Sequence, residues 1–554
     1  MAENDTALMG AGSASGRGGI FLSITAATII GVFYLWRLWL LNYHGFDPDE
    51  FFYLHRAWCE SRGMIPYRDF FDHHTPWLFF ILAPVFRLYP VDSNPEAAVE
   101  FIFLGRRIMM VFTGMGLVLT FVLARLWRGN SVAWIATALL STSVVFMRKT
   151  LEIRPDGLAM VLWLGSLVLT FIAVKDPNVS SRRLWLFGFS GFLLGGAIMT
   201  TQKMLLMVPG FTVAMAWYLL GGSGTQRARL AGCLWQLAGF WVPVLATLAF
   251  FVAHHALYRF FEYNLVFNLN WPNRFAPWTL LRIAVHWNPA VFVLGSSGLL
   301  LEIAREPRTL GFTLNRLLFV ITIGALASLV EIPNPFFQYY LTFLPLLAIY
   351  AADFLWFTTC ELIGPDTQPK SARSKIAIAT VLVIAMVCAD RLFAPNEAFG
   401  PMLCVALFLT AGAALMFRFP EPALALFVIG LSIEPYHYIR KHSMPHMNDQ
   451  RLHQLRLVLT ITRPADTVMD GWSGLGVFRP HAYFYWSLSP RNRFILSSQD
   501  RRELLSGLRS GRIAPRLIFP DQDGLGWISP EVELFLLKYY ELVPGEFPIF
   551  RRKE

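Results

Sequence analysis

The chain has 554 residues, of which 55% are hydrophobic and 15% are charged, and its mean hydropathy is +0.48. Soluble domains carry about 25% charged residues, so the composition excludes an ordinary soluble enzyme and predicts an all-α polytopic membrane protein. The net charge is +10. Because the Lys and Arg residues cluster in short loops between apolar segments, we attribute this charge to membrane orientation and expect no nucleic-acid partner.

Residues 1–19 are polar and predict a disordered cytoplasmic tail, and residues 20–437 predict a transmembrane domain. The apolar stretch Pro76–Tyr89 is short and contains Pro84 and Arg87, so we expect a re-entrant or interfacial helix there. About thirteen other segments are long enough to cross the bilayer. These predicted spans are 21–41, 108–126, 131–147, 157–174, 184–200, 204–220, 231–254, 286–304, 317–331, 338–357, 376–391, 401–417 and 422–437.

With a cytoplasmic N-terminus, every cytoplasmic loop is cationic, as the positive-inside rule requires. The first external loop (42–90), the segments 148–156, 258–282 and 332–338, and the C-terminal tail then share the outer face. We expect a multi-pass protein of the cell inner (cytoplasmic) membrane, with the active site outside.

Residues 438–554 are polar enough to form a small extracytoplasmic α/β domain. Alternating polar and apolar residues predict strands at 465–472, 493–498, 515–521 and 547–552. The segments 448–462 and 530–540 look helical.

The segment Gly45–Pro76 concentrates acids and histidines at the membrane face, where ionisable groups are costly unless they serve a function. Asp47 precedes Pro48 and is equally suited to capping a helix and to a functional site. The adjacent acids Asp49 and Glu50 exceed what one cap needs, so we interpret both as catalytic. The residues after them predict an amphipathic helix on the membrane surface.

Three strings of this loop, D-E-F-F-Y-L-H-R-A, R-G-M-I-P-Y-R-D-F and H-T-P-W-L, resemble the first-loop signature of GT-C-type membrane glycosyltransferases. The similarity is to bacterial relatives of the protein O-mannosyltransferases and lipid A aminoarabinose transferases. It implies a GT-C-like fold, a polyprenyl-phosphate sugar donor, and a loop acid that acts as base, which corresponds to Asp49 with Glu50 beside it. The family commonly has two prolines after the loop histidine, whereas Thr75-Pro76 follows His74, our candidate for substrate binding.

The resemblance extends to two later segments. Asp156 matches an acid at the start of the fourth span, and we interpret it as catalytic. Arg154 either binds the substrate or only pairs with Asp156. Lys203 follows a glycine-rich helix that resembles the family's G-L-A-x-x-x-K pattern and is a candidate for phosphate binding, although a lysine there can also extend to the interface without a role.

Two further loops supply candidates for substrate binding. Arg274 lies in a loop rich in amides and aromatic residues that suits a sugar, or is an ordinary polar loop. Gln338 and Tyr339 resemble the family's short loop before a late span, with an aromatic belt as the alternative.

The predicted reaction is transfer of one sugar from the polyprenyl phosphate to an acceptor hydroxyl on a lipid, glycan or protein. Asp49 takes the acceptor proton, and Lys203, Arg154 and Arg274 stabilise the phosphate leaving group. A single base without a covalent intermediate predicts inversion. A divalent cation, Mg²⁺ or Mn²⁺, held by Asp49, Asp156 and the phosphate is compatible with oxygen ligands.

The alternative function is a transporter or flippase of lipid-linked sugars, which calls for charged residues in mid-span and for internal repeats. An enzyme requires Asp49, Asp156 and Lys203 to converge on one outward cavity.

Overall fold

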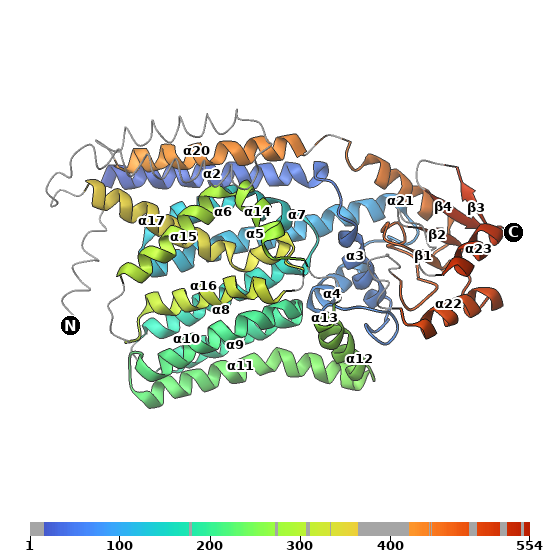
Figure 1. Cartoon of the computed structure of the whole chain (residues 1–554), viewed down its shortest axis with the longest axis horizontal. Coiled ribbons are helices and arrows are strands. Elements are labelled where there is room, and N and C mark those ends of the chain that lie inside the picture. Colours follow the sequence, from blue (N-terminus) through green and yellow to red (C-terminus); the bar gives the residue numbers. More distant parts are fainter. Residues whose placement is uncertain are drawn as a thin grey trace.

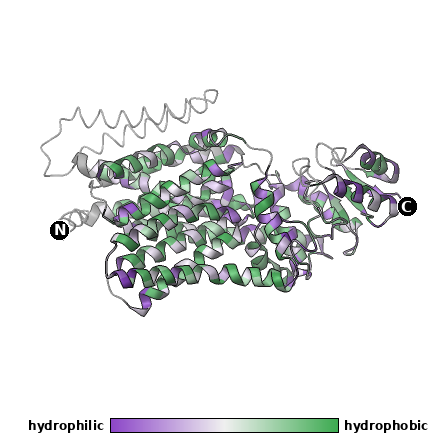
Figure 2. Cartoon of the chain, turned by 60° about the horizontal axis from the view of Figure 1, so that its bottom comes forward, coloured by the Kyte–Doolittle hydropathy of each residue, from purple (hydrophilic) through white to green (hydrophobic). Residues whose placement is uncertain are grey.

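The protein has a long helical bundle at one end and a small sheet at the other, with the helices of the first loop between them (Figure 1). Hydrophobic residues cover most of the bundle, and hydrophilic residues gather at the helix ends and around the sheet (Figure 2). The computed structural model describes residues 16–176, 180–271, 275–305, 311–332, 334–363, 420–442, 444, 446–486, 496–520, 529–544 and 548–553.

Seven described helices are long and apolar enough to cross a membrane, or nine if each of two bent helix pairs counts as one span. Two of the predicted spans, 376–391 and 401–417, lie outside the described residues. The long bundle helices are α2 (Gly16–Tyr43), α5 (Pro95–Arg128), α8 (Pro155–Lys175), α9 (Ser181–Thr200), α10 (Val208–Gly221), α11 (Gln226–Ala253), α16 (Leu314–Glu331), α17 (Leu344–Ile363) and α20 (Pro420–His442).

Two segments predicted as single spans are bent. The span predicted at 131–147 divides into α6 (Asn130–Thr142) and α7 (Val144–Leu151), which meet at 65°. Ser143 has extended backbone between them, and its hydroxyl accepts a hydrogen bond from the Phe146 amide, which starts α7 as a new helix. The bend places the end of α7 beside the first loop.

The second bent pair is α14 (Trp278–Trp287) and α15 (Pro289–Arg305), which meet at 106°. The break falls at Asn288, because a residue before proline is disfavoured in the helical region.

The first loop folds into three short elements. These are α3 (Pro48–Ser61), α4 (Trp77–Leu82) and the 3₁₀ helix η1 (Ala83–Leu88). The last two cover the segment predicted as a short helix that does not cross, and neither is among the candidate spans.

The prediction that the helix after Asp49 lies on the membrane surface is wrong. Every residue of α3 from Glu50 to Cys59 is buried. The C-terminal part of the chain covers the helix: the Trp486 ring lies 4.6 Å from that of Phe52, and Gly474 lies against Phe51. Its apolar residues therefore face protein.

The C-terminal part forms the small α/β unit that the sequence predicts. In the described residues of this unit, four strands form a sheet in the order β1-β2-β4-β3, with β1 and β2 parallel and the other two pairs antiparallel. Three of the predicted strand segments contain strands. In the segment 493–498, residues 493–495 lie outside the described residues and Ser498 begins a helix. The elements are α21 (Asp449–Ile461), β1 (Val468–Asp470), α22 (Ser498–Ser510), β2 (Leu517–Phe519), α23 (Pro530–Tyr539), β3 (Tyr540–Val543) and β4 (Ile549–Arg552).

Candidate active site

The first turn of α3 is fixed by a capping box. The Asp47 carboxylate accepts a hydrogen bond from the Asp49 amide at 3.0 Å, and Glu50 accepts one from the Asp47 amide at 3.0 Å. Pro48 occupies the first turn, where its fixed φ suits a helix start. Asp47 is therefore a helix cap, which is one of its two predicted roles. It also forms an ion pair with Arg154.

Glu50 lies in a closed ion pair. Both its carboxylate oxygens accept hydrogen bonds from Arg106 of α5, at 2.6 and 2.8 Å, and the Ile153 amide donates to it at 3.1 Å. Neither the Glu50 nor the Arg106 side chain is accessible. These contacts do not favour the catalytic role predicted for Glu50. They fit a residue that positions α3 against α5 and against the segment after α7.

Arg154 connects the first loop with the segment between α7 and α8. Its guanidinium donates to Asp49 at 3.0 Å, pairs with Asp47 at 2.8 Å and donates to Glu152. Lys149 at the end of α7 donates to Glu152 at 2.7 Å. No ion pair links Arg154 to Asp156 in the described part of the chain, so the simple pairing considered from the sequence is not what Arg154 does.

The Asp49 side chain is partly accessible, whereas Arg154, the cation that pairs with it, is buried. The Asp49 side chain is 31% accessible and that of Arg154 is 3% accessible. Protein nonetheless surrounds Asp49 closely, and this burial raises its pKa above the ordinary value. The Arg154 charge acts in the opposite direction, and the Asp47 charge raises the pKa further. The result is a carboxylate of enhanced basicity held in a fixed orientation.

Lys203, Tyr339 and Asp156 form the other side of this site. Lys203 is in the 3₁₀ helix η2 (Gln202–Met207) and Tyr339 in the 3₁₀ helix η4 (Phe337–Thr342). The Lys203 ammonium donates to the Tyr339 hydroxyl and lies 3.7 Å from the centre of its ring. Asp156, in the first turn of α8, is buried and acts electrostatically on both residues, as does Asp49.

Asp49 and Asp156 therefore lie close enough to Lys203 to act on it electrostatically, although the three residues come from α3, α8 and η2. None of the three lines the cavity described below, so their meeting in one outward cavity stays a prediction. Gln338 is buried next to Tyr339 and hydrogen-bonds to it. Arg274, also predicted to bind substrate, lies outside the described residues.

His74 belongs to a second cluster in the first loop. One oxygen of the buried Asp72 accepts hydrogen bonds from the amides of His73, at 2.6 Å, and His74, at 3.0 Å. The same oxygen lies 3.2 Å from Arg56. The His74 ring lies between Asp72 and the Tyr53 hydroxyl, 3.3 Å from each. Burial holds the pKa of both histidines well below the usual value, so both are neutral.

The described residues contain one group of three close acidic or histidine side chains able to hold a metal ion, and it is Asp72, His73 and His74. Asp49 and Asp156 are not part of it. Arg154 already occupies one Asp49 oxygen, and the Mg²⁺ or Mn²⁺ site at Asp49 and Asp156 stays a prediction.

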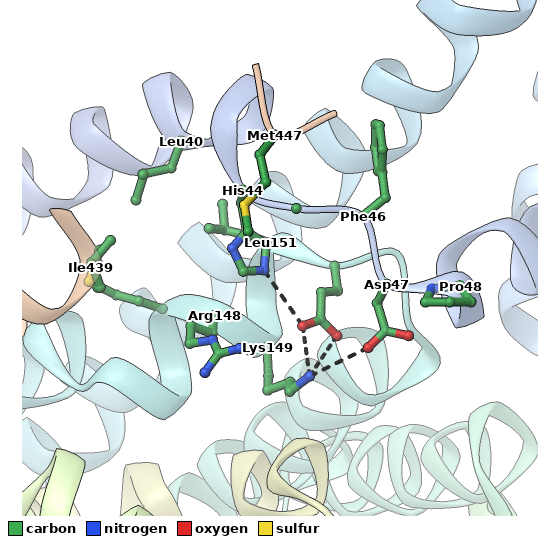
Figure 3. A pocket seen from close by; sticks show the side chains of 13 residues that line it. Leu40, His44, Phe46, Asp47, Pro48, Arg148, Lys149, Leu151, Ile439 and Met447 are labelled. Carbon is green, nitrogen blue, oxygen red and sulfur yellow. Dashed lines mark hydrogen bonds and ion pairs between the residues drawn. The ribbon is translucent and has the colours of Figure 1, made fainter. Parts of the chain in front are cut away.

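A cavity of about 350 Å³ opens beside Asp47 (Figure 3). In Figure 3, Lys149 points towards Asp47, and dashed contacts join Lys149 and His44 to the same carboxylate, that of Glu152. Apolar side chains of α2 and α20, including Leu40 and Ile439, form the opposite wall. The cavity thus has an ionic side and an apolar side.

Sequence reasoning missed several residues of the site. Arg106 stands two residues before the predicted span 108–126, and a charged residue in such a position signals a buried partner. Glu152 and Lys149 belong to the predicted outer segment 148–156 but carry no motif. Asp72 and His73 adjoin the quoted H-T-P-W-L string, and their juxtaposition depends on the turn of the loop.

A family model described as dolichyl-phosphate-mannose-protein mannosyltransferase matches residues 73–257. A crystal structure of ArnT from Cupriavidus metallidurans bound to undecaprenyl phosphate is similar, with a TM-score of 0.62 and 13% identity over 97% of this chain and 98% of that one. The chain has the fold of the GT-C-type membrane glycosyltransferases.

A second GT-C structure is similar over a smaller share of its length. The archaeal oligosaccharyltransferase AglB from Archaeoglobus fulgidus, in complex with an inhibitory peptide and a dolichol-phosphate, has a TM-score of 0.50 and 13% identity, over 96% of this chain and 74% of that one. The curated proteins contain no match. The GT-C fold was expected from the first-loop strings, and this expectation is confirmed.

Proposed function

We propose that this GT-C chain transfers a sugar from a polyprenyl-phosphate donor to an acceptor hydroxyl at the outer face of the cell inner membrane. The observation that carries the proposal is the convergence of Asp49, Asp156, Lys203 and Tyr339 from four separate segments. The family match and the printed ligands of the similar structures, undecaprenyl phosphate and dolichol-phosphate, support a lipid-linked donor.

Lys203 and Tyr339 hold the donor phosphate. Cations and hydroxyl donors directed at the leaving group stabilise the charge that develops as the glycosidic bond breaks. The first turn of α8 adds the partial positive charge of a helix N-terminus. Asp156 lies at that turn and acts electrostatically on Lys203, so an acid stands near the ammonium before the phosphate arrives.

Asp49 removes the proton from the acceptor hydroxyl. Its raised pKa improves it as a base, because a base works best when its pKa approaches the working pH. Arg154 holds the carboxylate in place at 3.0 Å. A single base acting on the face opposite the phosphate gives inversion at the anomeric carbon.

The acceptor reaches Asp49 through the cavity beside Asp47. The cavity has one charged wall and one apolar wall, which suits the polar end of an amphiphilic acceptor. These two walls favour a lipid-borne acceptor over a soluble glycan or a protein.

The test is a transfer assay with purified full-length protein and a panel of undecaprenyl-phosphate sugars. Released undecaprenyl phosphate is measured by mass spectrometry with membrane lipid extract as the acceptor source. We expect release from at least one donor by the wild-type protein and none from Asp49→Asn. A folded Asp49→Asn variant with full activity would remove the role assigned to this carboxylate. Movement of intact donor across a vesicle membrane, without release of undecaprenyl phosphate, would favour a flippase.

A further inference from the structure

Only one oxygen of the buried Asp72 carboxylate in the first loop has hydrogen-bond partners. Its Oδ1 atom accepts the amides of His73 and His74 and lies near Arg56, at 2.6, 3.0 and 3.2 Å. Its Oδ2 atom is buried and has no hydrogen-bond partner. An unpaired carboxylate oxygen in a buried position is costly, and native structures rarely contain one without a ligand.

A second unpaired atom lies in the next residue. The Nδ1 atom of His73 is also buried without a hydrogen-bond partner. The rings of His73 and His74 are 4.0 Å apart between centroids. The side chains of Asp72, His73 and His74 each offer a ligand atom, and these atoms lie within 4.8 Å of one another.

The backbone of this turn is fixed independently of the side chains. Gln202 and Asn268 donate to the His73 carbonyl at 2.8 and 3.0 Å, and Tyr67 donates to the His74 carbonyl at 2.5 Å. The unpaired atoms are therefore not needed to hold the loop. An ordinary Asp72–His74 hydrogen bond would explain the 3.3 Å contact between them but leaves Asp72 Oδ2 and His73 Nδ1 unexplained.

We propose that Asp72, His73 and His74 bind a zinc ion. Less than 1 Å² of either unpaired atom is accessible, so solvent does not satisfy them, whereas an ion held among the three side chains would. Two imidazoles and one carboxylate are a ligand set that Zn²⁺ favours, and three protein ligands leave a fourth position open. Mg²⁺ and Mn²⁺ prefer all-oxygen sites.

The surroundings supply the outer contacts that zinc sites usually have. Arg56 holds the Asp72 oxygen that faces away from the ion. Tyr53 lies 3.3 Å from His74 Nε2, and this contact fixes the ring orientation if Nδ1 is the ligand atom. The role of the ion rests on the proposed function: the open zinc position takes an oxygen of the donor phosphate beside Lys203.

The experiment measures metal in purified full-length protein, without requiring transfer activity. After removal of metal with a chelator, Zn²⁺ alone is titrated, and bound metal is counted by mass spectrometry. We expect about one zinc per chain with a K-edge absorption spectrum of mixed nitrogen and oxygen ligands. His73→Gln and His74→Gln should weaken zinc binding more than about 100-fold, and Tyr53→Phe about 10-fold, because loss of an outer partner alone costs about 10- to 100-fold.

The controls separate a metal site from a structural effect. His453→Gln changes an exposed histidine of α21 and should retain zinc. Because His73 Nδ1 has no partner, His73→Gln should unfold at the wild-type temperature in chelator and lose only the stabilisation by added zinc. Asp72→Asn keeps an oxygen for the two amides and provides a second variant should His73→Gln fold poorly.

Protein without stoichiometric zinc, zinc retained in His73→Gln, or preferential binding of Mg²⁺ or Mn²⁺ would each overturn the proposal. A protein that binds zinc but releases no lipid phosphate would refute the proposed function and leave the zinc site standing. Undecaprenyl-phosphate release without zinc dependence or zinc content would refute the zinc site alone.

Discussion

Arg154 and Asp49 are 105 positions apart in the sequence, and their side chains are joined by a 3.0 Å hydrogen bond. The guanidinium is buried, and it pairs with Asp47 and Glu152 as well. This one cation therefore sets the position of the first loop relative to α8. It leaves part of the Asp49 carboxylate accessible, and the function that we propose depends on that accessible oxygen.

Asp49→Asn should lower the rate of transfer about 100- to 10,000-fold, the range over which a positioned base contributes. The amide keeps the size of the side chain and can still accept from Arg154, so binding of bare undecaprenyl phosphate should remain at the wild-type level. Release of lipid phosphate and binding by thermal shift are measured on the same preparation. Equal losses of binding and rate would indicate a folding defect instead of a lost base.

The pH dependence of transfer should follow Asp49. The base acts when deprotonated, so the rate should rise with pH through the raised pKa of Asp49, at higher pH than for an ordinary carboxyl. Asp47→Asn removes a charge that raises this pKa, and asparagine still caps the helix. The acidic limb of the profile of kcat/KM should therefore move to lower pH in Asp47→Asn. A limb that stays in place would assign the titration to another group.

Glu50→Gln should destabilise the protein by about 3–5 kcal/mol, because it leaves the Arg106 charge buried without its counter-ion. The measurement is the free energy of unfolding in detergent. Glu96→Gln is the matched control, since Glu96 pairs with Arg456 at 2.6 Å on an exposed surface, and its stability should match the wild type. A stable but inactive Glu50→Gln variant would support the catalytic role predicted from the sequence.

Lys203→Met should weaken binding of undecaprenyl phosphate about 10- to 100-fold, since a hydrogen bond to a charged group contributes about 1.5–3 kcal/mol. Methionine keeps the length and the apolar stem of lysine. Tyr339→Phe should have a smaller effect of the same sign, because the cation remains. Affinity measured by competition with a labelled polyprenyl phosphate checks both, and an unchanged affinity in Lys203→Met would place the phosphate elsewhere.

Leu40→Trp should obstruct the cavity beside Asp47 from its apolar wall. We expect a higher KM for the acceptor with unchanged affinity for undecaprenyl phosphate. Trp39 on the same helix is exposed, and Trp39→Leu serves as the control for altered contacts with lipid or detergent. A change in donor affinity alone would assign the cavity to the donor.

The sequence predicted much of the site because local patterns specify it. Asp47-Pro48-Asp49-Glu50 encodes a capped helix start, and the structure has a capping box there. Cationic loops indicated which segments share a face. The contacts of Arg154 with Asp49 and of Asn268 with His73 join three of these segments. The sequence did not show the bends at Ser143 and Asn288, where a single residue interrupts an otherwise apolar stretch.

Composition and local pattern by themselves determined that the chain is a helical membrane protein with a polar C-terminal α/β unit, and that ionisable residues gather in a few loops. Only the tertiary structure decided which acid is buried in an ion pair and which stays partly accessible. Asp49 and Glu50 are neighbours in sequence, but successive helical residues point in different directions. One therefore pairs with Arg106 in the protein interior, and the other keeps a partly accessible side chain that acts electrostatically on Lys203.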